Sequence, residues 1–264
     1  MPFVNNQGIA IHYKVEGQGP PLVMQYGQYF PLEIWYELNY VDALQDHCQL
    51  ILVDARGHGG SDKPYAPEAY RIELMVSDIV AVLDHLGLDQ ASYMGYSSGG
   101  YLGYALAKHA PHRLRSLILG GTGPYTGPDP TAGTAWHIDQ ANRLVTQTTA
   151  EFVADIETFV ASLGFPPFSP RLKSAMMKHD LCALVAWHRS VVSVILAYDD
   201  IPREISVPCL LYAGEDTAEY ADARRAAEEI PDAAFVGIPH GQHLEGGTWI
   251  ETLKPHIVRT VGRL

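Results

Sequence analysis

The sequence has few cysteines and no long apolar run. Its three cysteines, Cys48, Cys182 and Cys209, lie far apart without CxxC spacing, which excludes a disulfide framework and a cysteine-based zinc site. We expect buried, reduced thiols in a cytoplasmic protein. No window approaches the ~20 apolar residues of a membrane span. The N-terminal stretch has no basic segment followed by an apolar run, so we expect neither a signal peptide nor a membrane partner.

Basic residues are also scarce. Lys and Arg number 18 against 30 Asp and Glu, which gives a net charge of −12. This balance argues against nucleic acid or an anionic membrane as a partner. Charged residues make up only 18% and apolar residues 47% of the 264 positions, which excludes a disordered or coiled-coil protein. The chain is long enough for one large domain, with or without an insertion.

Short apolar runs alternate with helical patterns in the first half of the chain. A continuous apolar strand at 50–53 ends in Asp54, and apolar positions with helical spacing follow over 70–86 until Gly87. This rhythm predicts an α/β fold with a mostly parallel central sheet flanked by helices. Ligands of such sheets bind beyond the carboxyl ends of the strands. Further strands are predicted at 9–17, 21–27, 91–97, 114–121, 208–215 and 233–239.

The rhythm breaks near Gly123, and only helical pattern follows until the strand at 208. Thr148 and Glu151 have the spacing of a capping box before an apolar stripe. A loop at 164–170 precedes a longer helical stretch that runs through Trp187 to Ala197. We therefore predict an α/β core of residues 1–123 and 206–264, with a helical cap inserted at 124–205.

The stretch MGYSSGGYLG places Gly-x-Ser-x-Gly, residues 95–99, between a predicted strand and a predicted helix. A strand that turns at once into a helix strains the tip residue and brings the chain close to itself, so its neighbours at ±2 must be small. The positive end of the helix then faces whatever Ser97 attacks. The pattern favours Ser97 as a nucleophile over an ordinary N-cap serine.

A nucleophilic serine needs a base, and the base needs an orienting carboxylate. After the last strand, PHGQHLEG supplies His240 and His243. We choose His243 because it sits in the loop beyond the strand end, from which a side chain can reach back over the sheet. The acid should follow the strand ending in YAG. We select Asp216, and Glu215 and Glu219 also qualify by type.

The motifs QYGQ, DARGHGGSDKP, GYSSGG, YAGED and PHGQH stand in an order and spacing that resemble the α/β-hydrolase fold superfamily, in its lid-bearing serine esterase branch. The resemblance covers nearly the whole chain outside the cap. It implies that Ser97 is the nucleophile, His243 the base and Asp216 the acid, without a cofactor or metal. It also implies an oxyanion hole from the backbone N–H groups of Gln28 and Ser98, and a loop-shaping role for DARGHGGSDKP.

Two positions depart from the family pattern. Tyr26 precedes Gly27 where the family usually has histidine, and Thr217 stands where the acid usually lies, three residues past the glycine of YAG. Asp216 is one residue early. Either that loop is shifted, or Glu215 or Glu219 serves, or the acid comes from another strand end.

We expect hydrolysis of a small carboxylic ester, lactone or related acyl compound through an acyl-enzyme on Ser97. A carbon–carbon bond hydrolase or a cofactor-free perhydrolase would use the same residues, and a non-catalytic ligand receptor is the alternative of another class. Epoxide hydrolase and haloalkane dehalogenase relatives carry aspartate where this chain has Ser97. Tyr29, Tyr96, Trp136, Phe165 and Trp187 are the candidates for contact with an apolar small-molecule substrate. For Trp136, Phe165 and Trp187, which lie in the predicted cap, the alternative role is to form the core of that cap.

Overall fold

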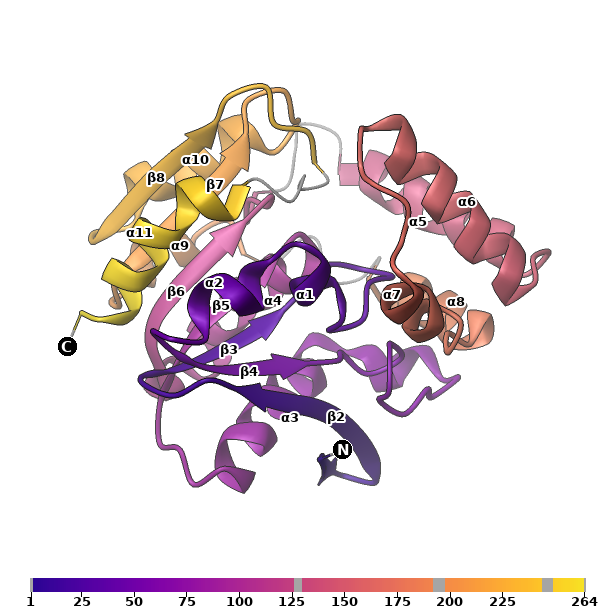
Figure 1. Cartoon of the computed structure of the whole chain (residues 1–264), viewed down its shortest axis with the longest axis horizontal. Coiled ribbons are helices and arrows are strands. Elements are labelled where there is room, and N and C mark those ends of the chain that lie inside the picture. Colours follow the sequence, from indigo (N-terminus) through magenta and orange to yellow (C-terminus); the bar gives the residue numbers. More distant parts are fainter. Residues whose placement is uncertain (1, 126–129, 192–197, 244–248, 264) are drawn as a thin grey trace.

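An eight-stranded sheet forms the centre of the protein (Figure 1). The computed structural model describes residues 2–125, 130–191, 198–243 and 249–263. The strand order is β1-β2-β4-β3-β5-β6-β7-β8, with β1 and β2 antiparallel to their neighbours and the other pairs parallel. This confirms the predicted α/β fold. The strands are β1 (Phe3–Asn6), β2 (Ile9–Glu16), β3 (Pro21–Gln25), β4 (Gln49–Val53), β5 (Ala91–Tyr96), β6 (Leu114–Gly120), β7 (Cys209–Gly214) and β8 (Ala233–Ile238).

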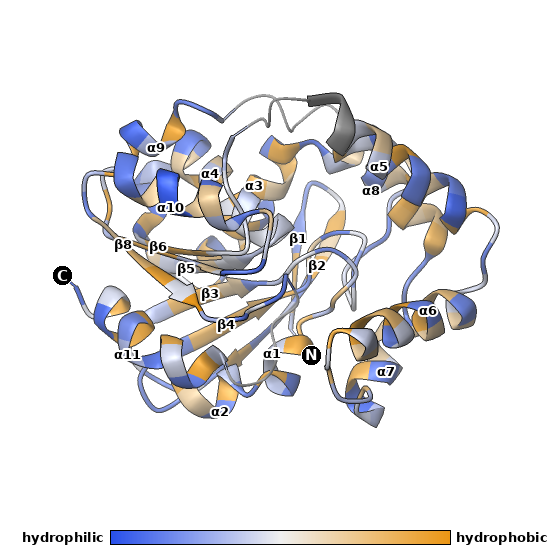
Figure 2. Cartoon of the chain, turned by 90° about the horizontal axis from the view of Figure 1, so that it is seen from above, coloured by the Kyte–Doolittle hydropathy of each residue, from blue (hydrophilic) through white to orange (hydrophobic). Residues whose placement is uncertain are grey.

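Helices cover both faces of the sheet (Figure 2). Strand β5 shows why: its side chains alternate between two buried apolar clusters, with Met94 and Tyr96 in one and Ala91 and Tyr93 in the other. Burial on both faces is typical of parallel strands. One face is covered by α1 (Ile34–Glu37), α2 (Tyr40–Leu44) and α11 (Trp249–Val261), and the other by α3 (Ile72–His85), α4 (Ser98–His109), α9 (Ile201–Glu204) and α10 (Tyr220–Glu229). Two short 3₁₀ helices, η1 (Pro67–Tyr70) and η2 (Pro111–Arg113), lie in connections.

Four helices lie between β6 and β7, and we call them the helical insertion. They are α5 (Pro130–Leu144), α6 (Thr149–Ser162), α7 (Pro170–Met176) and α8 (Leu181–Val191), and they gather beside one end of the sheet (Figure 1). The short α9, which packs on the sheet, also precedes β7 and is not part of this insertion. The predicted capping box is present: Thr148 N–H donates to Glu151 Oε2 at 2.8 Å, and Glu151 N–H to Thr148 Oγ1 at 3.3 Å. The predicted helical stretch beyond 191 lies outside the described residues as far as 197. The division at 123/124 and 205/206 stays a prediction.

The DARGHGGSDKP segment connects β4 to neighbouring elements. Asp54 Oδ1 accepts a hydrogen bond from Leu32 N–H at 2.7 Å, and Asp54 Oδ2 accepts one from Gly60 N–H at 2.7 Å. Arg56 forms a two-pronged pair with Asp78 of α3 in which both N···O distances are 2.6 Å. Because these charges are buried and mutually paired, they fix the loop after β4 beside the turn that follows β3.

The surface and the cysteines add two observations. Cys48 and Cys209 are buried, but Cys182 is exposed, so the expectation of three buried thiols is wrong for Cys182.

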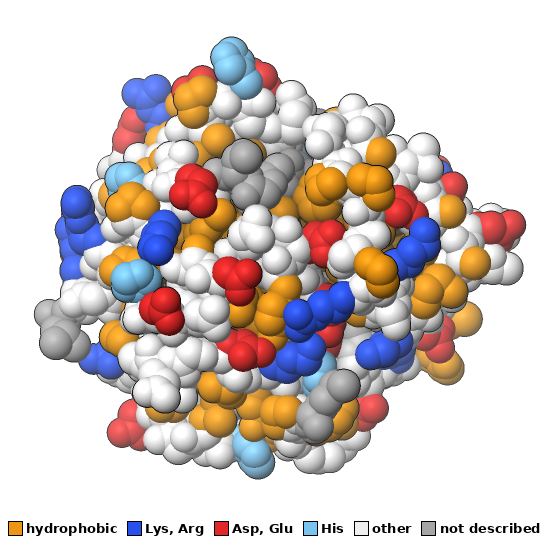
Figure 3. All heavy atoms as spheres, in the orientation of Figure 1, with side chains coloured by type: hydrophobic (Ala, Val, Ile, Leu, Met, Phe, Trp, Pro, Cys, Tyr) orange, Lys and Arg blue, Asp and Glu red, His pale blue; other side chains and the backbone are white. Residues whose placement is uncertain are grey.

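On the face seen in Figure 3, acidic and basic side chains are interspersed with apolar ones. Of the helices that the structure describes, none combines the length and apolar character required to cross a bilayer.

Candidate active site

Ser97 occupies the junction of β5 and α4 in a strained backbone conformation. Its φ is 54° and its ψ is −120°, a region that residues other than glycine rarely adopt. Ser97 N–H donates to the carbonyl of Gly120 on the adjacent strand β6 at 2.8 Å, and helix α4 begins at the next residue. The predicted sharp turn from strand to helix is therefore present, with the half-buried Ser97 at its tip.

Close backbone approaches explain the glycines around Ser97. A Cβ on Gly95 would lie 2.1 Å from the carbonyl oxygen of Gly99, and a Cβ on Gly99 would lie 2.2 Å from that of Gln25. Gly27 approaches Ser97 itself, since a Cβ there would lie 2.8 Å from Ser97 Cβ. The positions two residues before and two after the serine thus admit no side chain, as the sequence pattern predicts.

His243 reaches Ser97 from the connection between β8 and α11. Its Nε2 lies 3.1 Å from Ser97 Oγ, and its side chain is 40% exposed. His240 is exposed, and in the part of the chain that the structure describes its side chain makes no hydrogen bond. Of the two histidines considered, the structure brings His243 to Ser97.

Tyr96 lies beneath the site, buried to 1% exposure, with its ring stacked on Tyr26 at 5.0 Å between centroids. Its hydroxyl donates to the main-chain carbonyl of His243. The structure therefore places Tyr96 where it holds the loop that carries His243.

Glu219 is the carboxylate that approaches His243, with Oε2 3.3 Å from Nδ1. The prediction of Asp216 at this place is not met: Asp216 and Glu215 are exposed, and among the described residues the Asp216 carboxylate pairs with no group. The reason is a tight turn in which both the N–H and the hydroxyl of Thr217 donate to the Gly214 carbonyl. Glu219, the residue before α10, directs its carboxylate toward His243.

The electrostatics of Glu219 fit an ionised orienting group. Burial raises the pKa of its carboxyl, but the neighbouring His243 ring outweighs burial and leaves the pKa lowered. The 3.3 Å contact has the distance of an ion pair but not the alignment of a good hydrogen bond, since Nδ1 has no well-directed partner among the described residues. Such contacts are often long before substrate binds.

The backbone N–H groups of Gln28 and Ser98 remain available beside the serine. Gln28 follows Gly27, which touches Ser97, and Ser98 is the first residue of α4. Within the described ranges, neither N–H donates to a backbone carbonyl outside the regular elements or to a side chain. Two free donors next to a serine at a helix N-terminus can stabilise a negatively charged oxygen.

A sequence profile of the family described as alpha/beta hydrolase fold matches residues 20–185. The chain belongs to the α/β-hydrolase fold family. It is similar to 3-oxoadipate enol-lactonase 2 of Acinetobacter baylyi, with 30% identity over 231 residues that cover 85% of this chain and 83% of the relative.

Solved structures of the α/β-hydrolase fold superimpose on nearly the whole chain. A hydrolase from Pseudomonas aeruginosa PA01 has a TM-score of 0.80 at 25% identity, covering 99% of this chain and 98% of that one. The enol-lactonase from Burkholderia xenovorans LB400 has a TM-score of 0.81 at 21% identity, covering 99% and 100%. The latter likeness concerns the fold alone.

The aromatic residues expected around the substrate of this α/β-hydrolase pack against other aromatic and histidine side chains. Phe165 packs on Phe168, and Trp187 packs edge-on against His58, both buried. Trp136 is 44% exposed and lies against His137 and His188. Tyr29 is buried and its hydroxyl contacts His188. The ring contacts of these side chains are made with the insertion and adjoining loops, and do not include Ser97 or His243.

The sequence analysis missed a buried group of histidines at the boundary between the sheet and the insertion. His58 follows β4, while His137, His179 and His188 come from the insertion, and all four are buried. Their spacing matches no motif. Packing of α5 against α8 brings His137 to His188, and His58 lies against His179. Among the described residues, no set of three or more His, Cys, Asp or Glu is placed to hold a metal ion.

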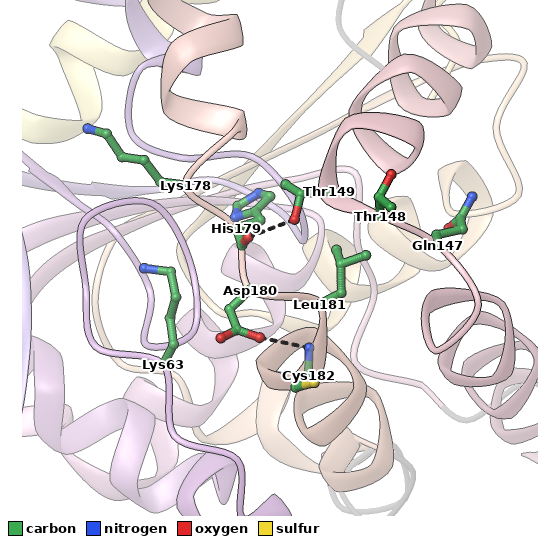
Figure 4. Close-up of a pocket in the computed structure, with 9 residues that line it drawn as sticks. All are labelled: Lys63, Gln147, Thr148, Thr149, Lys178, His179, Asp180, Leu181 and Cys182. Carbon is green, nitrogen blue, oxygen red and sulfur yellow. Dashed lines mark hydrogen bonds between the residues drawn. The ribbon is translucent and has the colours of Figure 1, made fainter.

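A pocket of about 520 Å³ opens near the loop of Lys63 (Figure 4). Neither Ser97 nor His243 lines it. Its polar side chains are partly engaged with each other: Thr149 Oγ1 donates to the His179 carbonyl, and Cys182 N–H donates to Asp180. The lining residues are Lys63, Gln147, Thr148, Thr149, Lys178, His179, Asp180, Leu181 and Cys182.

Proposed function

We propose that the protein is a serine hydrolase that cleaves a small carboxylic ester or lactone through an acyl-enzyme on Ser97. The observation that carries the proposal is the 3.1 Å contact between Ser97 Oγ and His243 Nε2 at a strained strand–helix turn. A serine in hydrogen-bond reach of an imidazole that a carboxylate orients is the arrangement that activates a nucleophile.

In the proposed reaction, Ser97 Oγ attacks the substrate carbonyl while His243 Nε2 takes the hydroxyl proton. Glu219 stabilises the resulting imidazolium and holds the ring in orientation. The N–H groups of Gln28 and Ser98 donate to the oxyanion of the tetrahedral intermediate, and loss of one such donor typically costs ~3 kcal/mol of transition-state stabilisation.

His243 then returns the proton to the leaving oxygen as the carbonyl reforms. An ester releases its alcohol, whereas a lactone ring opens and keeps the alcohol on the acyl chain. Water, activated by His243, attacks the acyl-enzyme and releases the acid and Ser97. The similarity to an enol-lactonase supports the inclusion of lactones in the substrate class.

Replacement of Ser97 by Ala tests the proposal. We expect loss of turnover of p-nitrophenyl esters and lactones, loss of labelling by a fluorophosphonate probe, and an unchanged thermal unfolding midpoint. Labelling of the wild type but not of the S97A variant would also exclude a ligand receptor, because Ser97 would not be activated in such a protein. Turnover by the S97A variant at the wild-type rate contradicts the proposal. Product analysis with diketones as substrates distinguishes carbon–carbon bond hydrolysis from ester hydrolysis.

A further inference from the structure

Tyr29 is held by the helical insertion at two points. It follows Gln28, the proposed oxyanion donor, in the segment 26–30 that we call the oxyanion loop. Its φ is 72°, an uncommon value for a residue other than glycine. The Tyr29 carbonyl accepts a hydrogen bond from His179 Nε2, in the connection between α7 and α8. Its hydroxyl lies 2.7 Å from His188 Nε2 on α8.

The contact with His188 continues into a second helix of the insertion. His188 Nδ1 lies 2.9 Å from Nδ1 of His137 on α5, and both side chains are buried. Burial lowers the pKa of His188 to about 3 and that of His137 to about 4, so both rings are neutral near pH 7. In one consistent arrangement Tyr29 donates to His188 Nε2, and His188 Nδ1–H donates to His137.

The surroundings of Tyr29 make these contacts hard to exchange for water. Tyr29 is 6% exposed, and its ring packs edge-to-face on Phe152 of α6 at 5.1 Å. Buried polar groups that lose a partner pay the full desolvation cost. Tyr29 is therefore fixed by contacts with α6, α8 and the α7–α8 connection, and α5 supports this arrangement through the contact of His137 with His188.

Other hydrogen bonds join the insertion to the rest of the chain without involving the oxyanion loop. Tyr65 Oη donates to Asp180 Oδ2 at 2.6 Å, and Ser169 N–H donates to Glu37 Oε1 at 3.0 Å. Docking of the insertion therefore does not depend on Tyr29 alone. What distinguishes the Tyr29 contacts is that they end on the residue next to Gln28.

We propose that the helical insertion positions the oxyanion hole, because His179 and His188 hold Tyr29 and thereby fix the Gln28 N–H. This inference rests on the proposed function. Tyr29, His179 and His188 are then positioning residues that act through Gln28. The insertion is then part of the catalytic arrangement.

Tyr29→Phe is the principal test, since it removes only the hydroxyl. We expect kcat for a p-nitrophenyl ester to fall about ten-fold or more with little change in KM, because a misplaced oxyanion donor weakens the transition state more than the substrate complex. Tyr65→Phe is the matched control, which breaks another contact of the insertion and leaves kcat within about two-fold. His179→Gln retains an N–H donor and keeps activity, whereas His179→Leu loses it.

Hydrogen exchange of the amides at 27–30, measured without substrate, supplies a readout independent of turnover. We expect faster exchange in Tyr29→Phe and His179→Leu, and wild-type exchange in Tyr65→Phe, His179→Gln and Ser97→Ala. Equal effects of Tyr29→Phe and Tyr65→Phe on kcat, or no effect of Tyr29→Phe on kcat and exchange, overturn the inference. Absence of fluorophosphonate labelling in the wild type contradicts the proposed function instead. The exchange rates then still show whether the insertion orders the oxyanion loop.

Discussion

At the scale of single residues, three carboxylates compete for the role of acid within five positions. Glu215, Asp216 and Glu219 are equivalent by type, and only Glu219 reaches His243. Sequence reasoning could predict Ser97 and His243, because sterics at the elbow and the position after the last strand restrict the choice. It could not select Glu219, because the turn closed by Thr217 decides which carboxylate faces inward.

Glu219→Gln is therefore expected to lower kcat by about 10²- to 10⁴-fold, since a neutral amide neither stabilises the imidazolium nor fixes the tautomer of His243. Steady-state kinetics on a p-nitrophenyl ester measure the effect. Asp216→Asn removes an exposed carboxylate next door and should leave kcat within about two-fold. A larger loss of kcat in Asp216→Asn than in Glu219→Gln would contradict the assignment of Glu219 as the acid.

At the scale of elements, the local sequence pattern predicts those helices and strands that bury one or two regular faces. The predicted helix over 70–86 is observed as α3, and its end at Gly87 has the expected left-handed φ of 68°. Tyr70 lies in the 3₁₀ helix η1 instead. Helices α1 and α2 were not predicted, because four or five residues are too few for a periodic pattern.

The β5–α4 junction makes a prediction about its glycines. Gly95→Ala would place a methyl 2.1 Å from the carbonyl oxygen of Gly99, so we expect a loss of about 3 kcal/mol in the free energy of unfolding together with loss of esterase activity. Gly87→Ala is the control: its φ is 68° but the added methyl meets nothing within 4 Å, so it should cost about 1 kcal/mol and spare activity. Urea unfolding of both variants compares them, and equal losses would contradict the steric explanation.

At the scale of the whole molecule, the mostly parallel sheet follows from the alternation of strands and helices, but the contacts between sheet and insertion do not. Tyr29 and His188 are 159 positions apart, and no local pattern in either segment marks them as partners. The same holds for Tyr96 and the His243 carbonyl. Such pairs form only after the chain has folded, so a single sequence gives no sign of them.

Buried neutral histidines predict how the stability of the fold depends on pH. Burial lowers the pKa of His137 to about 4 and those of His179 and His188 to about 3, whereas an unfolded histidine titrates near 6.5. Between these values the unfolded chain binds more protons, so the free energy of unfolding falls as pH drops from about 6.5 to 4. The loss is on the order of 3 kcal/mol per histidine at pH 4.

Urea unfolding at several pH values measures this slope. His188→Leu should flatten it, because one buried imidazole is removed, and His112→Gln, at an exposed position, should leave it unchanged. An identical slope in the wild type and in His188→Leu would contradict the assignment of the acid sensitivity to the buried rings.

The two-point attachment of Tyr29 has a consequence for chimeric enzymes. A helical segment grafted from a relative that lacks imidazoles at positions 179 and 188 would leave the buried Tyr29 carbonyl without a donor and the Tyr29 hydroxyl without an acceptor. Exchanging that segment to obtain a new specificity therefore requires the turn after β3 to be transplanted with it, as a single module.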